Sequence, residues 1–289
     1  MSTLVLAPES PVRRLARVFR ASTYLGWQVS SNWTSPLRFA VYSILRPVSG
    51  ALILVVMYNV ISGGRARSYL AFLVIGVAFW SFVQNGFSDF ANAVLEDRGY
   101  YKMLKYVYIA PVRVQVYLLG RGLAQLGTAV SSALIVLVIA AFALRLPIDP
   151  AHVNYGLLAL SCALAFVAVV ALASAFALFL LAGRDAYGYG ELAAQALYIV
   201  SGAIFPISVL PGAIATIAAF SPIVYWLELV RRSLLGSNAV LMFPGLTDGE
   251  VLLRLIAGTL GLLVLATFAF RVADRMARSR GLIDMEGTD

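Results

Sequence analysis

The chain has 289 residues, of which 61% are hydrophobic and only 12% are charged, whereas charged residues make up about 25% of soluble domains. Because a soluble protein of this size must cover its surface with polar groups, this composition excludes a water-soluble fold and favours a protein embedded in lipid. The net charge of +8 does not indicate nucleic-acid binding, because the basic residues stand in short clusters between long uncharged runs, as in the cytoplasmic loops of membrane proteins.

The first predicted element is an amphipathic helix from Val12 to Trp33. Apolar residues recur on one face and arginines take the other: Val12, Leu15, Ala16, Phe19, Thr23 and Trp27 against Arg13, Arg14, Arg17 and Arg20. The apolar stripe is too interrupted to cross a membrane, so we expect the helix to lie flat in the headgroup region, with a solvated basic tail as the alternative. Residues 1–36 are assigned to a cytoplasmic N-terminus, without the apolar core and cleavage site of a signal peptide.

Six apolar runs are long enough to cross a hydrocarbon core that needs about 20 residues. They are Phe39–Ile61, Tyr69–Phe90, Gly122–Leu144, Tyr155–Ala182, Tyr187–Ser208 and Val251–Phe270. The expected fold is an all-α integral membrane protein with six transmembrane helices in residues 37–272, followed by a cytoplasmic tail at 273–289.

The stretch from residue 209 to 235 fits a re-entrant helical pair better than a full span. Pro211 and Ser221-Pro222 divide it into pieces of about 10 and 14 residues, which reach roughly 15 and 21 Å and fall short of a 30 Å core. Counting 213–235 as a seventh span is the alternative. That topology would place the arginine-rich tail outside, whereas six spans keep both termini and most of the 22 Lys and Arg in the cytoplasm.

The cytoplasmic segment from Ala93 to Pro111 carries a second amphipathic pattern. Its aromatic and aliphatic face is formed by Tyr100, Leu104, Val107 and Tyr108, with Arg98, Lys102 and Lys105 elsewhere. A short helix at this place, ended by Pro111, is suited to docking on a cytoplasmic partner. An ordinary surface helix is the alternative, and the segment alone does not decide between them.

At this segment the chain resembles the type-2 family of ABC exporter permeases, whose members carry a cytoplasmic coupling helix after the second span. The residues that fit the family pattern are Glu96, Arg98, Gly99, Leu104 and Pro111, while Tyr100 and Lys102 depart from it. A second match lies between Phe205 and Gly236. There the family's signature of prolines, an aromatic residue, Glu and Arg is held by Phe205, Pro206, Ser208, Pro211, Ser221, Pro222, Tyr225, Glu228 and Arg231.

The resemblance implies a permease that binds a cytoplasmic ABC ATPase and a second copy of itself in the bacterial inner membrane, with ATP and Mg²⁺ on the ATPase and no cofactor on this chain. It implies ATPase-coupling roles for Glu96, Arg98, Gly99, Tyr100, Leu104 and Pro111. It implies an outward-side re-entrant gate built from Phe205, Pro206, Pro211, Pro222, Tyr225, Glu228 and Arg231. The cargoes of the family are hydrophobic drugs, lipids and lipid-linked glycans.

The charges of the second match can neutralise one another. Glu228 stands at i,i+3 spacing from Arg231 and at i,i+4 spacing from Arg232. An unpaired charge would be costly near the outer leaflet. Because a self-paired charge has little left for a ligand, we favour a structural or gating role over substrate binding.

Two further patterns concern helix packing. Small residues recur at every fourth position of the third span, at Gly120, Ala124, Thr128 and Ser132, which allows close packing within the subunit or across a dimer. Aromatic residues are dense in the second span: Phe72, Phe79, Trp80, Phe82, Phe87 and Phe90. Phe79, Phe82 and Phe87 could line a path for cargo; contact with lipid is the alternative, because the aromatics ring the helix.

Other classes of function lack the residues they need. The only lysines, Lys102 and Lys105, follow no Gly-rich phosphate-binding loop, so the chain is not expected to hydrolyse ATP. One histidine, His152, and one cysteine, Cys162, do not make a metal or catalytic site, which disfavours a membrane-embedded lipid enzyme. A secondary transporter or channel remains as the alternative, although the sequence shows no internal repeat and no mid-membrane cluster of ionisable groups.

Overall fold

The computed structural model describes residues 10–31, 45, 48–50, 52–53, 55–58, 60, 67–99, 106, 114–144, 148–181 and 188–280. These residues form helices joined by turns, and no strand occurs among them, which confirms the all-α prediction for this part of the chain. In chain order the elements are α1 (Pro11–Ser31), α3 (Arg67–Gln84), the π-helical turn η1 (Asn85–Asp89), α4 (Phe90–Gly99), α6 (Val114–Leu144), α7 (Tyr155–Leu181), α8 (Tyr189–Val200), the 3₁₀ turn η2 (Ile207–Val209), α9 (Gly212–Phe220), α10 (Pro222–Leu235), the 3₁₀ turn η3 (Gly236–Asn238) and α11 (Asp248–Arg280).

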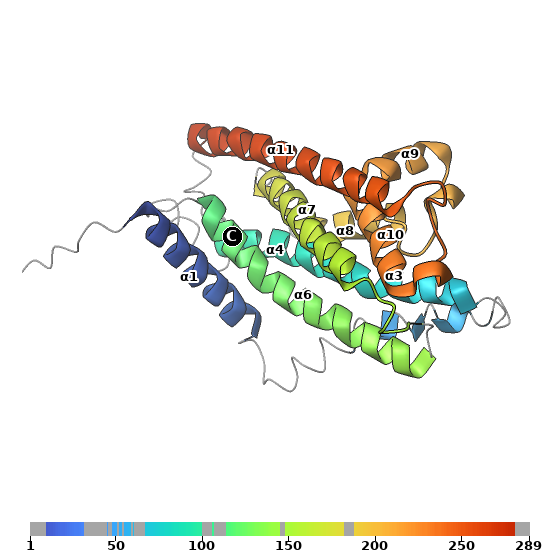
Figure 1. Cartoon of the computed structure of the whole chain (residues 1–289). Helices are drawn as coiled ribbons and strands as arrows, with labels where there is room; N and C mark the ends of the chain where they lie inside the picture. Colours follow the sequence, from blue (N-terminus) through green and yellow to red (C-terminus); the bar gives the residue numbers. More distant parts are fainter. Residues whose placement is uncertain are drawn as a thin grey trace, which may run out of the picture.

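The helices lie side by side as a bundle. In Figure 1, α3, α4, α6, α7 and α11 run along the molecule, and α1 lies along α6. The short helices α8, α9 and α10 lie together near the end of the molecule away from α1. α3, η1 and α4 follow one another without interruption, so residues 67–99 form one helical rod, called the α3–α4 rod below.

Three of the predicted spans are confirmed by described helices that are long and apolar enough to cross a membrane. They cover Tyr69–Ser88, Tyr155–Ala177 and Asp248–Ala269. α6 covers the predicted third span in full, and its 31 residues correspond to about 46 Å of helix. The predicted first span, Phe39–Ile61, falls largely outside the described residues.

The predicted span from Tyr187 to Ser208 is not confirmed as a single crossing. α8 has 12 residues, about 18 Å, which is short of a 30 Å core. The helix ends at Val200 because Gly202 adopts a φ of +73°, a left-handed conformation that terminates helices, and Pro206 follows soon after. The described helices therefore do not establish six spans.

The predicted break between α9 and α10 is present. The two helices have 9 and 14 residues and meet with a bend of 77°. Ser221 has an extended ψ of 124° because a residue that precedes proline is sterically kept out of the helical region. Pro222 then starts α10 at the first helical position, where its missing N–H leaves no hydrogen bond unmade. Whether the pair dips into the membrane and returns, or crosses it as a broken span, stays a prediction.

α1 packs along the first half of α6, and the two helices run in the same direction. A Cβ added at Gly120 would come within 2.6 Å of the Ser22 hydroxyl, and one added at Gly26 would come within 2.8 Å of Ala124. Gly120 and Ala124 of the small-residue stripe are thus used for packing within the subunit. At such sites only glycine allows the two helix backbones to approach so closely.

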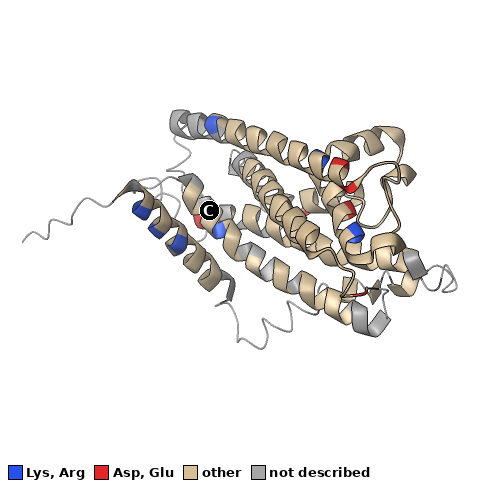
Figure 2. Ribbon diagram, viewed as in Figure 1, with Lys and Arg blue, Asp and Glu red and all other residues tan. Residues whose placement is uncertain are grey.

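Residues of the predicted stripe of α1 are partly exposed, and Phe19, Thr23 and Trp27 also line the side that faces α6. Val12 is 73% exposed and Trp27 is 48% exposed, which is consistent with contact to lipid. The arginines of α1 are also exposed and lie along the same helix (Figure 2). The flat orientation of α1 in the headgroup region stays a prediction.

Candidate functional site

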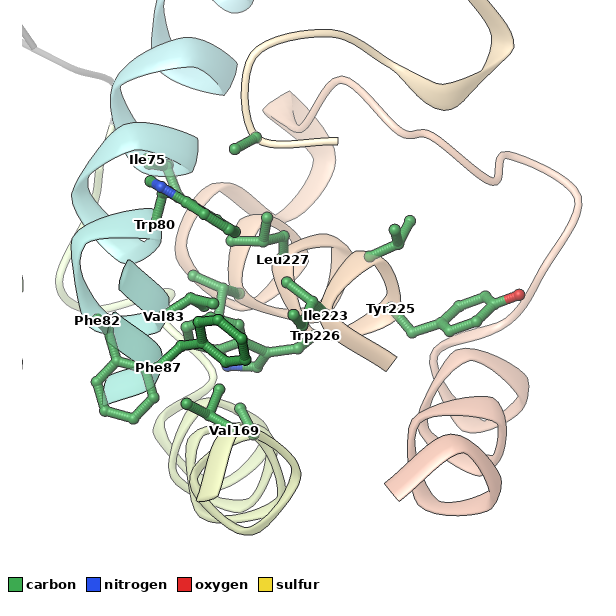
Figure 3. Packing of buried hydrophobic residues seen from close by; sticks show 14 of the residues in the cluster. Ile75, Trp80, Phe82, Val83, Phe87, Val169, Ile223, Tyr225, Trp226 and Leu227 are labelled. Carbon is green, nitrogen blue, oxygen red and sulfur yellow. The ribbon is translucent and has the colours of Figure 1, made fainter. Parts of the chain in front are cut away.

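The candidate site is organised around α10, which is buried on nearly every side. Of its 14 residues, all but Arg232 are buried. Trp226 is the centre of this packing: its ring contacts Phe79 and Phe82 of α3, with ring centroids 5.8 and 5.4 Å apart. Figure 3 shows Trp226 and Leu227 of α10 among side chains of α3, together with Val169 of α7. A helix buried all round is held rigidly by its neighbours.

Arg231 joins α10 to the α3–α4 rod and to the turn after α8. Its side chain has no exposed surface. Its guanidinium donates to the carbonyl oxygens of Gly202 (2.9 Å), Ala203 (3.1 Å) and Phe72 (3.3 Å), and it lies 3.5 Å from the centroid of the Phe72 ring. We call Arg231 with these three partners the outer clamp. A buried guanidinium is tolerated only when its donors are satisfied in this way.

Gly76 makes the outer clamp sterically possible. A Cβ at Gly76 would fall on the carbonyl oxygen of Ala203 and would lie 2.6 Å from Arg231 Nη2. The turn after α8 can therefore approach the α3–α4 rod only because position 76 has no side chain. Tyr69, two turns earlier on the same helix, donates its hydroxyl to the carbonyl of Ile204 at 3.1 Å and extends the contact.

Glu228 and Arg232 hold the segment that leads into α11. Arg232 forms a salt bridge to Glu228 at 2.9 Å, and the Glu228 carboxylate, which has no exposed surface, also accepts the backbone N–H of Met242 at 3.0 Å. Arg232 further donates to the carbonyl of Leu246 at 2.8 Å and to Asp248 at 2.9 Å. The pairing predicted for Glu228 is confirmed at i,i+4 with Arg232. Arg231 instead donates to the backbone carbonyls of the outer clamp.

The aromatic and proline residues of the predicted gate frame the bend. Tyr225 donates its hydroxyl to the carbonyl of Ala219 across the break at 2.6 Å, and its ring stacks on Phe243 at 5.1 Å. Pro206 precedes η2, Pro211 precedes α9 and Pro222 begins α10. Each proline therefore stands where one helical piece ends and another begins. Phe205 is 46% exposed, so it lies at the surface of this end of the molecule.

Five aromatic residues of the α3–α4 rod pack against protein and not against lipid. The buried ones are Phe72, Trp80, Phe82, Phe87 and Phe90, with exposed fractions of 6% or less. Phe87 contacts Phe176 of α7 with ring centroids 5.1 Å apart. The lipid-facing alternative is wrong for these five side chains. A path-lining role for Phe79, Phe82 and Phe87 stays a prediction.

A second polar cluster ties the other end of the α3–α4 rod to α6. Asp97 and Arg121 are each 1% exposed and form a two-pronged ion pair, with Arg121 Nη2 2.7 Å from Oδ1 and Nε 3.1 Å from Oδ2 of Asp97. Tyr117 donates its hydroxyl to the same carboxylate at 2.7 Å. We call these three residues the inner joint. Bidentate arginine–carboxylate pairs fix geometry as well as charge.

The inner joint also contacts α1. A Cβ at Gly26 of α1 would lie 3.4 Å from both Cα and Cδ of Arg121. At Gly122, a Cβ would fall 2.5 Å from the Phe90 ring, so α4 packs equally closely on α6. Arg121 is therefore enclosed between α4 on one side and α1 on the other.

The predicted coupling segment, 93–111, begins within α4 and continues past its end at Gly99. Glu96 is half-buried, and burial raises its pKa, while Arg121 lowers that pKa and Asp97 raises it. Arg98 and Gly99 form the last residues of α4. Tyr100, Leu104 and Pro111 lie outside the described residues. The coupling roles of all six predicted residues stay predictions.

Glu191 at the start of α8 is the centre of a smaller polar cluster. Its carboxylate accepts hydrogen bonds from Gln84 at 2.7 Å and from Ser88 at 2.9 Å, which belong to the α3–α4 rod, and from Gln195 at 3.2 Å. Ser88 lies in the π-helical turn, a wider turn that often marks a functional position. Within the described residues, no group of three or more His, Cys, Asp or Glu side chains could hold a metal ion.

Neither the inner joint nor the outer clamp was predicted from the sequence. Neither Asp97 nor Arg121 was predicted as a site residue from the sequence. Arg121 offered one signal, because it is a lone charge beside an apolar run and such a charge needs a buried partner. Asp97 offered none, because it stands between Glu96 and Arg98 in a charged stretch.

The sequence model of the ABC-2 type transporter family matches residues 21–235. This range covers α1 from residue 21 onward, and the α3–α4 rod, α6, α7, α8, α9 and α10 in full. No curated protein matches the chain.

Proposed function

This chain belongs to the ABC-2 type transporter family, as its multi-pass transmembrane permease and not its ATPase, and we propose that it exports a hydrophobic or amphipathic cargo across the cytoplasmic membrane. The match confirms the family resemblance predicted from the sequence. ABC-2 permeases pair with ATPase subunits, which bind ATP and Mg²⁺. The proposed assembly is a homodimer of this chain with two ATPase subunits, both termini being cytoplasmic, and the proposed cargo is a drug, a lipid or a lipid-linked glycan.

The observation that supports a coupled transport mechanism is the α3–α4 rod with a polar contact near each end. Asp97 of the inner joint and Phe72 of the outer clamp lie on this one rod, roughly 37 Å apart at 1.5 Å rise per residue. A continuous helix transmits a displacement along its axis better than a loop does. A push on the coupling segment after Gly99 is therefore expected to reach the bent pair α9–α10.

In the proposed cycle, ATP binding closes the partner ATPases and moves the coupling segment Ala93–Pro111. The inner joint carries that displacement from α4 to α6, and α1 follows because it packs on Arg121. The outer clamp carries it to the turn at Gly202 and to α10. ATP must bind one conformation of the complex more tightly than the other, because a ligand with equal affinity for both shifts no equilibrium.

The charges at the outer end favour an apolar or amphipathic cargo. Glu228, Arg231 and Arg232 each contact protein groups at hydrogen-bond distance. A charge that is already neutralised and hydrogen-bonded offers little to a charged ligand. This supports the gating or structural role proposed for the bent pair.

The test is reconstitution of the chain with its copurifying ATPase in lipid vesicles, measuring ATP hydrolysis and transport in the same preparation. Gly99→Leu and Leu104→Ala should abolish the coupling of hydrolysis to transport while the chain still inserts and binds lipid. Leu160→Ala, at a position 48% exposed on α7, is the matched control and should leave the coupling unchanged. Normal coupling in both coupling-segment variants, or failure of any ATPase to copurify, would refute the proposal.

A further inference from the structure

A groove between α1 and α6 has the chemistry of a lipid site. It has a volume of about 490 Å³, within the range of small-molecule sites. α1 contributes Phe19, Arg20, Tyr24 and Trp27 to its walls, and α6 contributes Leu123 and Gly127. Thr23 and Ala124 complete the lining, and the Thr23 hydroxyl donates to the Phe19 carbonyl at 2.8 Å. Apart from Arg20 and the hydroxyls of Tyr24 and Thr23, the walls are apolar. None of its lining residues belongs to the bent pair α9–α10 or to the coupling segment, 93–111.

The groove is polar at one end and apolar at the other. Arg20, Tyr24 and Trp27 follow one another at i, i+4 and i+7, so they line one face of α1 over roughly 10 Å. Trp27 lies beside Gly127, whose added Cβ would meet only the Trp27 ring, at 3.9 Å. Because α1 and α6 run in the same direction, the Arg20 end of the groove lies toward the start of α6 and the Trp27 end toward its middle.

The polar end offers two unused donors. Arg20 makes no hydrogen bond or ion pair to another described residue, in contrast to Arg121, which is neutralised by Asp97. The Tyr24 hydroxyl accepts the Gln28 amide at 2.9 Å, so its own proton is left to donate. A guanidinium and a hydroxyl one helical turn apart suit the oxygens of a phosphate.

We propose that this groove binds one anionic phospholipid, with its phosphate at Arg20 and Tyr24 and an acyl chain along Trp27, Leu123 and Gly127. The occupant is a lipid and not a peptide, because a single cation followed by an apolar channel matches a headgroup joined to a hydrocarbon chain. The bound lipid fills the space between α1 and α6 beside the inner joint. It therefore fixes the position of α1 against Arg121.

The test uses quenching of Trp27 fluorescence by lipids brominated on the acyl chain, with the full-length chain in bilayers. A Trp33→Phe background is used, and the remaining tryptophans, Trp80 and Trp226, are 3% and 1% exposed and so are poorly reached. Brominated phosphatidylglycerol should quench Trp27 with about fivefold higher apparent affinity than brominated phosphatidylcholine, because one cation attracts a headgroup of net negative charge more than a zwitterionic one whose phosphate is offset by its own ammonium group.

Three variants separate a site from general attraction to the membrane. Arg20→Gln should remove the preference for phosphatidylglycerol, whereas Arg14→Gln, the same charge change on another face of α1, should keep it. Gly127→Leu should fill the groove and reduce quenching by both lipids, while Gly127→Ala should not. Equal quenching by the two lipids, equal effects of Arg20→Gln and Arg14→Gln, or unchanged quenching in Gly127→Leu would each overturn the proposal.

Discussion

Replacing Asp97 by Asn should loosen the contact between the α3–α4 rod and α6. The substitution keeps the shape of the side chain and one oxygen that can accept a hydrogen bond, but it leaves the Arg121 charge buried without a counter-charge. Breaking a buried ion pair in this way costs about 3–5 kcal/mol. Arg121 Nη1 already lacks a hydrogen-bond partner among the described residues, so the guanidinium has no second acceptor there to turn to. Because the amide oxygen of the new side chain can still accept the Tyr117 hydroxyl, we expect a loss of stability at the low end of this range, about 3 kcal/mol.

The assay is thermal unfolding of the purified chain in one detergent, combined with a double-mutant cycle. A loss of about 3 kcal/mol corresponds to a fall in Tm of roughly 6–12 °C. Adding Arg121→Met removes the uncompensated charge, so the double variant should recover most of the loss and the two effects should not add.

The same variants test the mechanism when they are reconstituted with the ATPase. The Asp97→Asn chain should transport less cargo per ATP hydrolysed, because α4 no longer carries α6 with it. An unchanged Tm, or a double variant as unstable as the sum of the two single changes, would refute the role assigned to the inner joint.

Three further predictions concern positions along the α3–α4 rod and the outer end. Gly76→Ala should lower the free energy of unfolding by roughly 1–3 kcal/mol through overpacking against the outer clamp, whereas Gly261→Ala, with nothing within 4 Å of the added Cβ, should not; thermal unfolding checks both. Arg232→Met should cost about 3–5 kcal/mol because a fully buried carboxylate loses its counter-charge, and chemical denaturation in detergent measures this. Burial raises the pKa of Glu96, so its stabilising contribution is present at low pH and is lost as pH rises through the raised pKa; Glu96→Gln should flatten the decline of Tm above pH 4.5.

Local chemistry made the bent pair predictable from the sequence. Pro211 and Ser221-Pro222 fix where helices must start, and the distance between them fixes how long each piece can be. The Glu228–Arg232 pair followed from i,i+4 spacing, which is a property of one helix. The long apolar spans followed from composition alone.

Contacts between distant segments were not predictable in this way. Asp97 and Arg121 meet because α4 packs on α6, and no periodicity within either helix states which helix is its neighbour. Arg231 bonds backbone carbonyls of residues 72, 202 and 203, and a backbone acceptor leaves no mark in the sequence. The early end of α8 was missed because its apolar composition continues past Val200 while the conformation of Gly202 stops the helix.

The central claim is that a separate ATPase moves this chain through the coupling segment, and a distance measurement tests it most directly. Spin labels are placed on cysteines at Tyr106 and Phe220, which are 65% and 81% exposed, after the native Cys162 has been replaced by Ala. With the ATPase bound, adding ATP and Mg²⁺ should shift the distance between the labels by several ångströms, and the isolated chain should show no shift. The claim is contradicted if the isolated chain responds equally to ATP, or if the complex does not respond.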